Sequence, residues 1–180
     1  NILCEDLMIK QYIRRYKDFP IKGIDFKCTA SLCQYAQGFR EANDFIYNSM
    51  NSLGIDKVVG IDARGFIFAS VLADRIRKPL ILARKGGKLP PPVNSKSYDL
   101  EYDTATLEIK SDSIEMIDKV VIIDDLIATG GTVNATIDII QELGGEVVAV
   151  GCIMDLPFLS GSNMIRDRGI PVFAGVEYDA

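Results

Sequence analysis

The residues best placed to do chemistry lie in one stretch, VVIIDDLIATGGT, which runs from Val120 to Thr132. Four apolar residues lead into two adjacent aspartates, Asp124 and Asp125, and a short glycine-bearing loop follows. The apolar run predicts a buried strand, and the loop is expected to lead into a helix that begins near Thr132. Free backbone N–H groups and the helix dipole at such a start favour a bound anion.

The loop itself carries further anion-binding features. Gly130 and Gly131 allow a ligand to approach the backbone closely, Thr129 and Thr132 add hydroxyl donors, and Ala128 opens the segment. The lysine of a P-loop is missing, so the loop is not expected to grip the terminal phosphates of a nucleoside triphosphate. For this loop alone, a tight strand-to-helix turn capped by threonine is the alternative interpretation.

The two aspartates narrow the choice of ligand. Adjacent carboxylates repel each other and would weaken the binding of a bare phosphate. They accept hydrogen bonds from hydroxyl groups, however, so a ligand with a phosphate at one end and a vicinal diol nearby would satisfy both features. That description fits a ribose 5-phosphate. Negative charge beneath the sugar would also stabilise positive charge that develops at the anomeric carbon.

The chain contains no histidine, which limits the available catalytic chemistry. Ser-His-Asp and Cys-His machinery is excluded, so any general acid or base must be a carboxylate, a lysine, a tyrosine or water. The four cysteines, Cys4, Cys28, Cys33 and Cys152, form no CxxC pair. We therefore expect free buried thiols and no structural zinc site.

Composition bounds the class of protein. With 180 residues, of which 48% are hydrophobic and 25% charged, the chain is expected to form a single domain over residues 1–180. A net charge of −5 argues against a nucleic-acid partner bound by bulk electrostatics. No apolar run approaches the roughly 20 residues of a membrane-spanning helix, and the first residues lack the apolar core of a signal peptide. We expect a cytoplasmic protein without a membrane partner.

Periodicity predicts strands that alternate with helices. Helical spacing is found over 9–16, 39–53, 63–77 and 132–145, and continuous Val/Ile runs predict strands at 57–63, 79–84, 120–124, 146–156 and 171–178. Residues 86–103, rich in Gly, Pro, Ser and Asn, are expected to form a long loop, with a short strand at 105–109 beside it. This pattern predicts an α/β fold with a mainly parallel, twisted sheet flanked by helices. Ligands in such sheets bind at the carboxyl ends of the strands, where the aspartate pair is expected.

VVIIDDLIATGGT resembles the phosphoribosyl-pyrophosphate signature of the type I phosphoribosyltransferases, and its wording is most similar to that of the adenine-specific branch. IDARGFIF, Ile61 to Phe68, resembles the segment of that family that contacts the pyrophosphate. The resemblance implies this role for Asp62, Ala63 and Arg64. Asp62 stands where the family more often has glutamate, and a surface arginine at a helix start is the alternative for Arg64.

Two further segments resemble the same family. ARKGGKLP implies that Arg84, Lys85 and Lys88 surround the pyrophosphate, although three clustered cations are also common on a solvated surface. SYDLEYDTATLEI resembles the family's mobile catalytic loop, here placed at about 86–110, and the resemblance implies that Glu101 handles a proton at N7 of the purine while Tyr102 helps to close the site. An ordinary exposed hairpin is the alternative.

DFPIKGIDFK, residues 18–27, resembles the family's base-binding segment, which implies a small N-terminal hood at about 1–35. The positions matched to purine recognition are Asp25, Phe26 and Lys27. The next residues, CTASLC, depart from the Asp-Ile-Thr-Pro wording usual in the family.

The resemblance implies transfer of the 5-phosphoribosyl group from phosphoribosyl pyrophosphate to adenine, which gives AMP and pyrophosphate. It also implies Mg²⁺ on the pyrophosphate and ribose oxygens, with mostly substrate and water ligands, and a homodimer. One alternative keeps the chemistry but uses hypoxanthine, guanine or xanthine as the base. Another is a non-catalytic regulator that senses the donor, but such a protein would ordinarily carry an added DNA-binding module, and no such segment is found.

Overall fold

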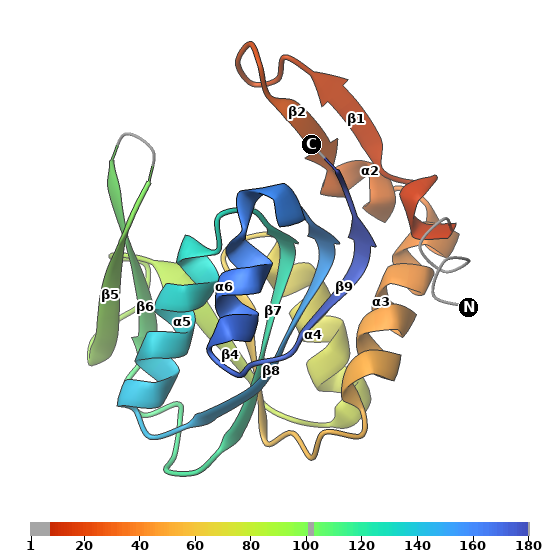
Figure 1. Cartoon of the computed structure of the whole chain (residues 1–180). Coiled ribbons are helices and arrows are strands. Elements are labelled where there is room, and N and C mark those ends of the chain that lie inside the picture. Colours follow the sequence, from red (N-terminus) through yellow and green to blue (C-terminus); the bar gives the residue numbers. More distant parts are fainter. Residues whose placement is uncertain (1–7, 101–102, 180) are drawn as a thin grey trace.

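A computed structural model of the chain, which describes residues 8–100 and 103–179, has a seven-stranded sheet at its centre (Figure 1). The strand order is β5-β6-β4-β3-β7-β8-β9. The five strands from β4 to β9 in this order are parallel, and their bounds are β4 Leu80–Lys85, β3 Lys57–Ile61, β7 Lys119–Ile127, β8 Glu146–Asp155 and β9 Val172–Glu177. The predicted mainly parallel α/β fold is confirmed.

Helices cover both faces of this sheet (Figure 1). One face packs against α3 (Ala36–Met50) and α4 (Gly65–Ile76), and the other against α5 (Gly131–Glu142) and α6 (Gly161–Asp167). A short 3₁₀ helix, η1 (Pro157–Leu159), connects β8 to α6. Part of each predicted helix from 39 onward is therefore found, with boundaries shifted by a few residues.

Strand β7 shows why the sequence reads as a continuous apolar run at this point. Val121 and Ile123 belong to the core beneath α3 and α4, whereas Val120 and Ile122 belong to the core beneath α5. All four side chains are fully buried, because alternate residues of a strand point to opposite faces. The strand therefore emerges at its carboxyl end from the centre of the molecule, which fixes the position of the aspartates that follow.

The helix predicted over 9–16 is wrong for most of its length. Residues 8–10 are helical, but Arg14–Lys17 forms strand β1, which pairs antiparallel with β2 (Asp25–Cys28). Ile9 and Ile13 are indeed buried, so the apolar spacing identified the correct inward-facing residues. Pairing with a strand further along the chain, which periodicity does not reveal, decides the backbone conformation. Helix α2 (Thr29–Cys33) follows directly, and together these elements form the predicted hood.

The long loop predicted over 86–103 is also wrong in large part. Strand β5 (Val93–Asp99) pairs antiparallel with β6 (Thr104–Lys110) over its whole length, and β6 continues the main sheet beside β4. The polar residues that suggested a loop lie on an edge strand, where one side of the chain faces solvent. The hairpin projects beyond the rest of the sheet in Figure 1, and Tyr98 of β5 and Leu107 of β6 line the candidate site.

No helix in the described part of the chain combines the length and the apolar character that crossing a membrane requires.

Candidate active site

A pocket of about 300 Å³ lies at the carboxyl end of β7. It brings together residues predicted from separate motifs of the sequence, along with four apolar or aromatic neighbours. The lining residues are Ile61, Asp62, Ala63, Arg64, Lys85, Tyr98, Leu107, Asp124, Asp125, Leu126 and Thr132. The predicted ribose, pyrophosphate and phosphate segments thus meet in one concave place, as expected for a doubly covered parallel sheet.

Asp125 is buried, with 4% of its surface exposed, and it is held by two donors from distant segments. The hydroxyl of Thr29 and the Nε of Arg64 each donate to the same carboxylate oxygen, Oδ2, at 2.5 Å. A buried carboxylate without such partners would be strongly destabilising. These two contacts fix the carboxylate through one of its oxygens, Oδ2.

Asp124 has a different environment from its neighbour. Its Oδ1 accepts a hydrogen bond from the backbone N–H of Asp125 at 2.8 Å and lies against the backbone at Gly65, where α4 begins. Burial, and then the charge of Asp125, raise the pKa of Asp124 well above its usual range. This environment therefore disfavours a second negative charge beside Asp125, and both side chains line the pocket.

Arg64 connects the predicted pyrophosphate segment to the acid pair. It stands immediately before α4, and about half of its side chain is exposed toward the pocket. Partial burial lowers the pKa of Arg64, but the adjacent Asp125 carboxylate outweighs this effect and raises it. Arg64 is therefore a permanent cation that stands at the start of α4 and pairs with Asp125 at the pocket.

The other predicted pyrophosphate residues occupy three kinds of position. Arg84 donates from Nε to Asp62 Oδ2 at 3.1 Å, so it braces the loop that carries Asp62 and Ala63. Lys85 lines the pocket. Lys88 is exposed in the turn after β4 and is not among the lining residues, so this single chain does not bring it to the pocket.

The predicted phosphate loop, residues 128–132, is held by close contact between backbones. Gly130 has a φ of +82°, and a Cβ there would lie 2.9 Å from the Cα of Gly161. A Cβ on Gly161 would in turn lie 2.3 Å from the carbonyl oxygen of Ala128, so neither position accepts a side chain without movement of the loop. Helix α5 begins at Gly131, and Thr132 reaches the pocket wall. Thr129 is exposed.

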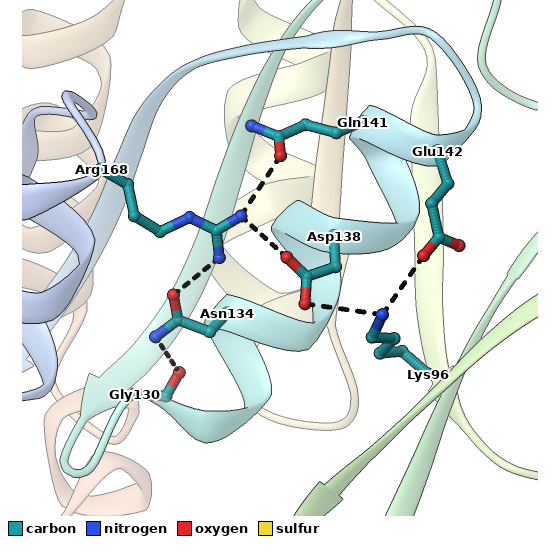
Figure 2. A network of polar contacts seen from close by, with 7 residues as sticks. All are labelled: Lys96, Gly130, Asn134, Asp138, Gln141, Glu142 and Arg168. Atoms are coloured by element: carbon teal, nitrogen blue, oxygen red, sulfur yellow. Dashed lines mark hydrogen bonds and ion pairs between the residues drawn. The ribbon is translucent and has the colours of Figure 1, made fainter.

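A polar network on the outer face of α5 fixes the orientation of this loop (Figure 2). The carbonyl of Gly130 accepts hydrogen bonds from the backbone N–H of Asn134 at 2.9 Å and from its side-chain amide at 3.0 Å. Arg168 donates to Asn134 at 3.0 Å and to Asp138 at 2.7 Å. Because a trans peptide points its N–H away from its C=O, the fixed Gly130 carbonyl turns the Gly131 N–H outward from α5.

The same network reaches the β5–β6 hairpin. Lys96 of β5 pairs with Glu142 at 3.3 Å and with Asp138 at 3.9 Å, as Figure 2 shows. On the pocket side of the hairpin, Tyr98 lies over Gly131, where a Cβ would come within 3.3 Å of its ring. Sequence reasoning missed Tyr98 as a pocket residue. Its place in the SYDLEYD motif was the available signal, but the motif was used to predict only Glu101 and Tyr102. These two residues lie outside the described part of the chain.

The predicted base segment lies in β2, beside the pocket and not in its wall. Phe26 is half-buried and packs edge-on against Phe19, with ring centroids 5.2 Å apart. Asp25 accepts a hydrogen bond from Nε of Arg15 at 2.9 Å and pairs with Lys27 at 3.5 Å. The neighbouring Arg15 guanidinium lowers the pKa of Asp25. Asp25 is therefore engaged within the hood.

A tyrosine next to the edge strand β9 contacts the hood. Tyr178, which follows β9, is buried, and three cations lie near its ring. The Nζ of Lys10 and of Lys27 lie 5.2 and 5.3 Å from the ring centroid, and the Cζ of Arg15 lies 5.7 Å away. These distances suit cation–π attraction, which holds the hood against the main sheet.

Comparison with known proteins identifies the family. The model described as the phosphoribosyl transferase domain matches residues 31–158. An adenine phosphoribosyltransferase of Agathobacter rectalis is 43% identical over 171 residues, which cover 95% of this chain and 97% of the relative. The crystal structure of adenine phosphoribosyltransferase from Rhodothermus marinus superimposes with a TM-score of 0.88 at 38% identity, over 98% of this chain and 99% of that one.

A more distant structure agrees. Adenine phosphoribosyltransferase from Saccharomyces cerevisiae, complexed with an imino-altritol bisphosphate and adenine, has a TM-score of 0.88 at 28% identity and covers 96% of this chain and 99% of that one. The similarity extends over nearly the whole chain and includes the sheet, the helices and the hood. The chain therefore belongs to the phosphoribosyltransferase family, within its adenine phosphoribosyltransferase branch.

Proposed function

We propose that this chain transfers the 5-phosphoribosyl group of phosphoribosyl pyrophosphate to adenine and releases AMP and pyrophosphate. The observation that supports this most strongly is the pocket in which Asp124 and Asp125 stand beside Arg64, Lys85 and the start of α5. The donor carries a diol, a diphosphate and a phosphate. Carboxylates can bind the diol, cations can bind the diphosphate, and the start of a helix can bind the phosphate.

The donor would lie along the carboxyl end of β7. Its ribose hydroxyls would donate to Asp124 and Asp125, and its 5-phosphate would accept from the backbone N–H groups and hydroxyls of the loop 128–132. Arg64 and Lys85 would neutralise the pyrophosphate, and Asp62, held by Arg84, would shape the loop beneath it. Lys88 lies outside this pocket, so we assign it to the pyrophosphate only if another subunit presents it.

In the reaction, N9 of adenine forms a bond to C1 of the ribose while the bond from C1 to the pyrophosphate oxygen breaks. Positive charge develops at C1 as the leaving group departs, and the acid pair beneath the sugar stabilises it. The adenine ring loses one proton overall, for which the family resemblance proposes Glu101 as the acceptor. Tyr98, above Gly131, would help to exclude water that could otherwise intercept C1.

The acid pair also suits Mg²⁺, because carboxylates are hard oxygen ligands. In the described part of the chain, no three His, Cys, Asp or Glu side chains gather as a metal site, and one oxygen of Asp125 is already engaged by Thr29 and Arg64. We therefore propose that Mg²⁺ would be held mainly by the pyrophosphate and ribose oxygens of the donor and by water, with the acid pair close by and no dedicated set of protein ligands. When bound, the ion would neutralise charge on the pyrophosphate leaving group.

We assign the base subsite to Asp25, Phe26 and Lys27. The aromatic ring of Phe26 is half-buried, so it offers one face to a purine, and the backbone of β2 can offer both donors and acceptors to its edge. The yeast relative binds adenine, by the description of its crystal structure, and the fold it shares with this chain includes the hood. Adenine is accordingly the proposed base.

We further propose a homodimer. Ile67 on α4 and Leu82 on β4 are each 37% exposed on adjoining elements, and a second subunit would cover them. The exposed Lys88 at the end of β4 adjoins the same region. Light scattering on the pure protein tests this proposal, since a monomeric mass at micromolar concentration would contradict it.

The free thiols Cys28, Cys33 and Cys152 suit a reducing compartment, which supports a cytoplasmic location.

A purine-base screen tests the proposed function. The pure protein is incubated with the donor, Mg²⁺ and each of adenine, hypoxanthine, guanine and xanthine, and pyrophosphate release is measured. Adenine is expected to be preferred by at least about tenfold, the discrimination that 1.4 kcal/mol provides. A preference for a 6-oxo purine would reassign the base, and release with none of the four would contradict the enzyme assignment.

A further inference from the structure

Three segments that are far apart in the sequence meet at one oxygen atom, Oδ2 of Asp125. Thr29 comes from the hood, Arg64 from the loop after β3, and Asp125 itself from the central strand β7. The Thr29 distance of 2.5 Å is typical of a hydroxyl that donates to a carboxylate, and Nε of Arg64 lies 2.5 Å from the same oxygen. This oxygen is therefore the point where the base, pyrophosphate and ribose segments are joined.

The contribution of Thr29 differs from that of Arg64. Thr29 is 2% exposed, so its hydroxyl exchanges no hydrogen bond freely with solvent. It is also the first residue of α2, which begins where the base-binding strand β2 ends at Cys28. A shift of β2 toward a bound base would therefore be carried by one peptide unit to the hydroxyl that orients the acid.

We propose that Thr29 is a positioning residue that sets the orientation of the Asp125 carboxylate and so couples the base segment to the ribose subsite. The proposal rests on the proposed function, because it takes Asp125 as a ligand of the donor's sugar. Oδ2 is held by two donors, and Asp125 also lines the pocket, so the way in which Oδ2 is held sets what the carboxylate offers to a ligand hydroxyl. Without the threonine hydroxyl, Arg64 alone would hold the carboxylate and leave its plane free to rotate.

The coupling is expected in both directions. If a bound base tightens the Thr29 contact, it improves the orientation of Asp125 and strengthens sugar binding. Thermodynamic linkage then requires that a bound sugar phosphate strengthens base binding by the same factor. A threonine is suited to this role because its β-branched side chain has few rotamers, so the hydroxyl follows the backbone of α2 closely.

The test compares Thr29→Val, which keeps the shape and removes the hydroxyl, with Thr29→Ser, which restores the hydroxyl. Ser31→Ala is the matched control. Ser31 is also 2% exposed and lies in the same helix, but its hydroxyl contacts the carbonyls of Tyr12 and Cys28 at 2.9 and 2.7 Å and does not contact Asp125. Ser31→Ala therefore loosens the hood without touching the acid.

Binding of ribose 5-phosphate is measured by calorimetry for all four proteins, with and without saturating adenine. Thr29→Val is expected to weaken binding by about tenfold, as for the loss of a hydrogen bond to a charged group, and to remove the effect of adenine. Thr29→Ser is expected to stay within about threefold of the original protein, and Ser31→Ala to lower the melting temperature while retaining ribose 5-phosphate affinity.

Three results would overturn the proposal: unchanged affinity in Thr29→Val, equal loss in Thr29→Ser, or equal loss in Ser31→Ala. An original protein in which adenine leaves ribose 5-phosphate affinity unchanged would overturn the coupling. Because these titrations need no turnover, they remain decisive even if the base screen shows no pyrophosphate release. The two failures are thus distinguishable.

Discussion

The two halves of the proposed site, one assigned to the sugar phosphate and one to the base, are built in different ways. The sugar-phosphate half consists of the carboxyl end of β7 and the start of α5, which belong to the main sheet and its covering layer and are backed by apolar cores on both faces. The base half consists of the two-stranded sheet β1–β2, which projects from the main body in Figure 1. It exposes several large apolar side chains, among them Phe19, Ile21 and Ile24.

This difference teaches where rigidity is placed in the molecule. The sugar-phosphate half is fixed by burial and by close contact of backbones at Gly130 and Gly161. The base half is fixed by a few polar and cation–π contacts, such as the Thr29–Asp125 hydrogen bond and the cations around Tyr178. Apart from Thr29, which joins the two halves, substitutions in the first half should therefore change donor use and stability, and substitutions in the second should change the use of adenine.

The largest effect is expected from Asp125→Asn. The variant keeps the side chain's shape but removes the charge that is proposed to face the ribose, and it removes the carboxylate that pairs with Arg64. Steady-state kinetics should show kcat/KM for the donor lowered by about 10²–10³, the scale for losing one group that stabilises charge in the transition state. A change in kcat/KM of less than about threefold would contradict the assignment of Asp125 to the sugar-phosphate half.

A matched pair of glycine variants tests the close contact of backbones. Gly130→Ala places a Cβ 2.9 Å from Gly161 at a φ of +82°, whereas Gly169→Ala has nearly the same φ, +80°, and open space around it. Gly169→Ala should cost about 1–2 kcal/mol of unfolding free energy from the backbone conformation alone. Gly130→Ala should add about 1–3 kcal/mol from overpacking and raise KM for the donor.

Chemical denaturation measures both stabilities, and kinetics measures both KM values. Equal destabilisation by the two variants would show that the packing of the phosphate loop against Gly161 contributes nothing. A rise in KM for adenine alone in Gly130→Ala would place the loop in the wrong half of the site.

The base half is tested by Phe26→Ala. Stacking of a base on an aromatic ring contributes about 1–3 kcal/mol, so KM for adenine should rise by roughly tenfold or more. KM for the donor should stay within about twofold, because Phe26 does not line the donor pocket. Initial rates with each substrate varied in turn distinguish the two constants. A larger effect on the donor than on adenine would remove the distinction between the halves.

The smallest effect separates the two aspartates by their response to pH. Since burial and Asp125 raise the pKa of Asp124 in the folded protein, the folded state holds an extra proton between the ordinary value of 3.8 and the raised value. Stability therefore falls as pH rises through that window, and the cost of the charge persists above it. Asp124→Asn should raise the melting temperature at pH 7 by about 2–4 °C for each kcal/mol relieved.

This gain in melting temperature should shrink as the pH is lowered toward 3.8. At pH 7 the Asp124→Asn variant should turn over more slowly than the unaltered protein, even though it is more stable. Asp125→Asn supplies the contrast, because Asp125 is already neutralised by Arg64 and its removal should bring no gain. Melting curves recorded between pH 4 and 8 measure the stability of both variants. Destabilisation by Asp124→Asn at pH 7 would contradict the direction of the pKa shift.

The same division explains what the sequence could predict. The strand, the aspartates and the loop from Val120 to Thr132 carry local signals, namely an apolar run, a charge pair and glycines before a helix, and the structure has β7, the loop and α5 there. Strand β1 was predicted as a helix and β5 as a loop, because both are defined by pairing with a neighbouring strand. Local periodicity does not contain that information.

The candidate site shows the same limit. The motifs nominated Asp62, Arg64, Lys85 and Thr132, which do line one pocket, because each motif follows the end of a strand of the parallel sheet. The contact between Thr29 and Asp125 joins residues 96 positions apart, and the residue pattern within either segment does not predict it. Lys88 was expected near the others from its place in a basic cluster, but the turn after β4 leaves it exposed.

The position of Tyr178 has a consequence for biosynthesis. A ribosome makes Lys10, Arg15 and Lys27 early, but the ring that these cations surround follows β9, the strand made after all the others of the sheet. The contacts between this ring and the three cations can therefore form only after the last strand of the sheet has been made.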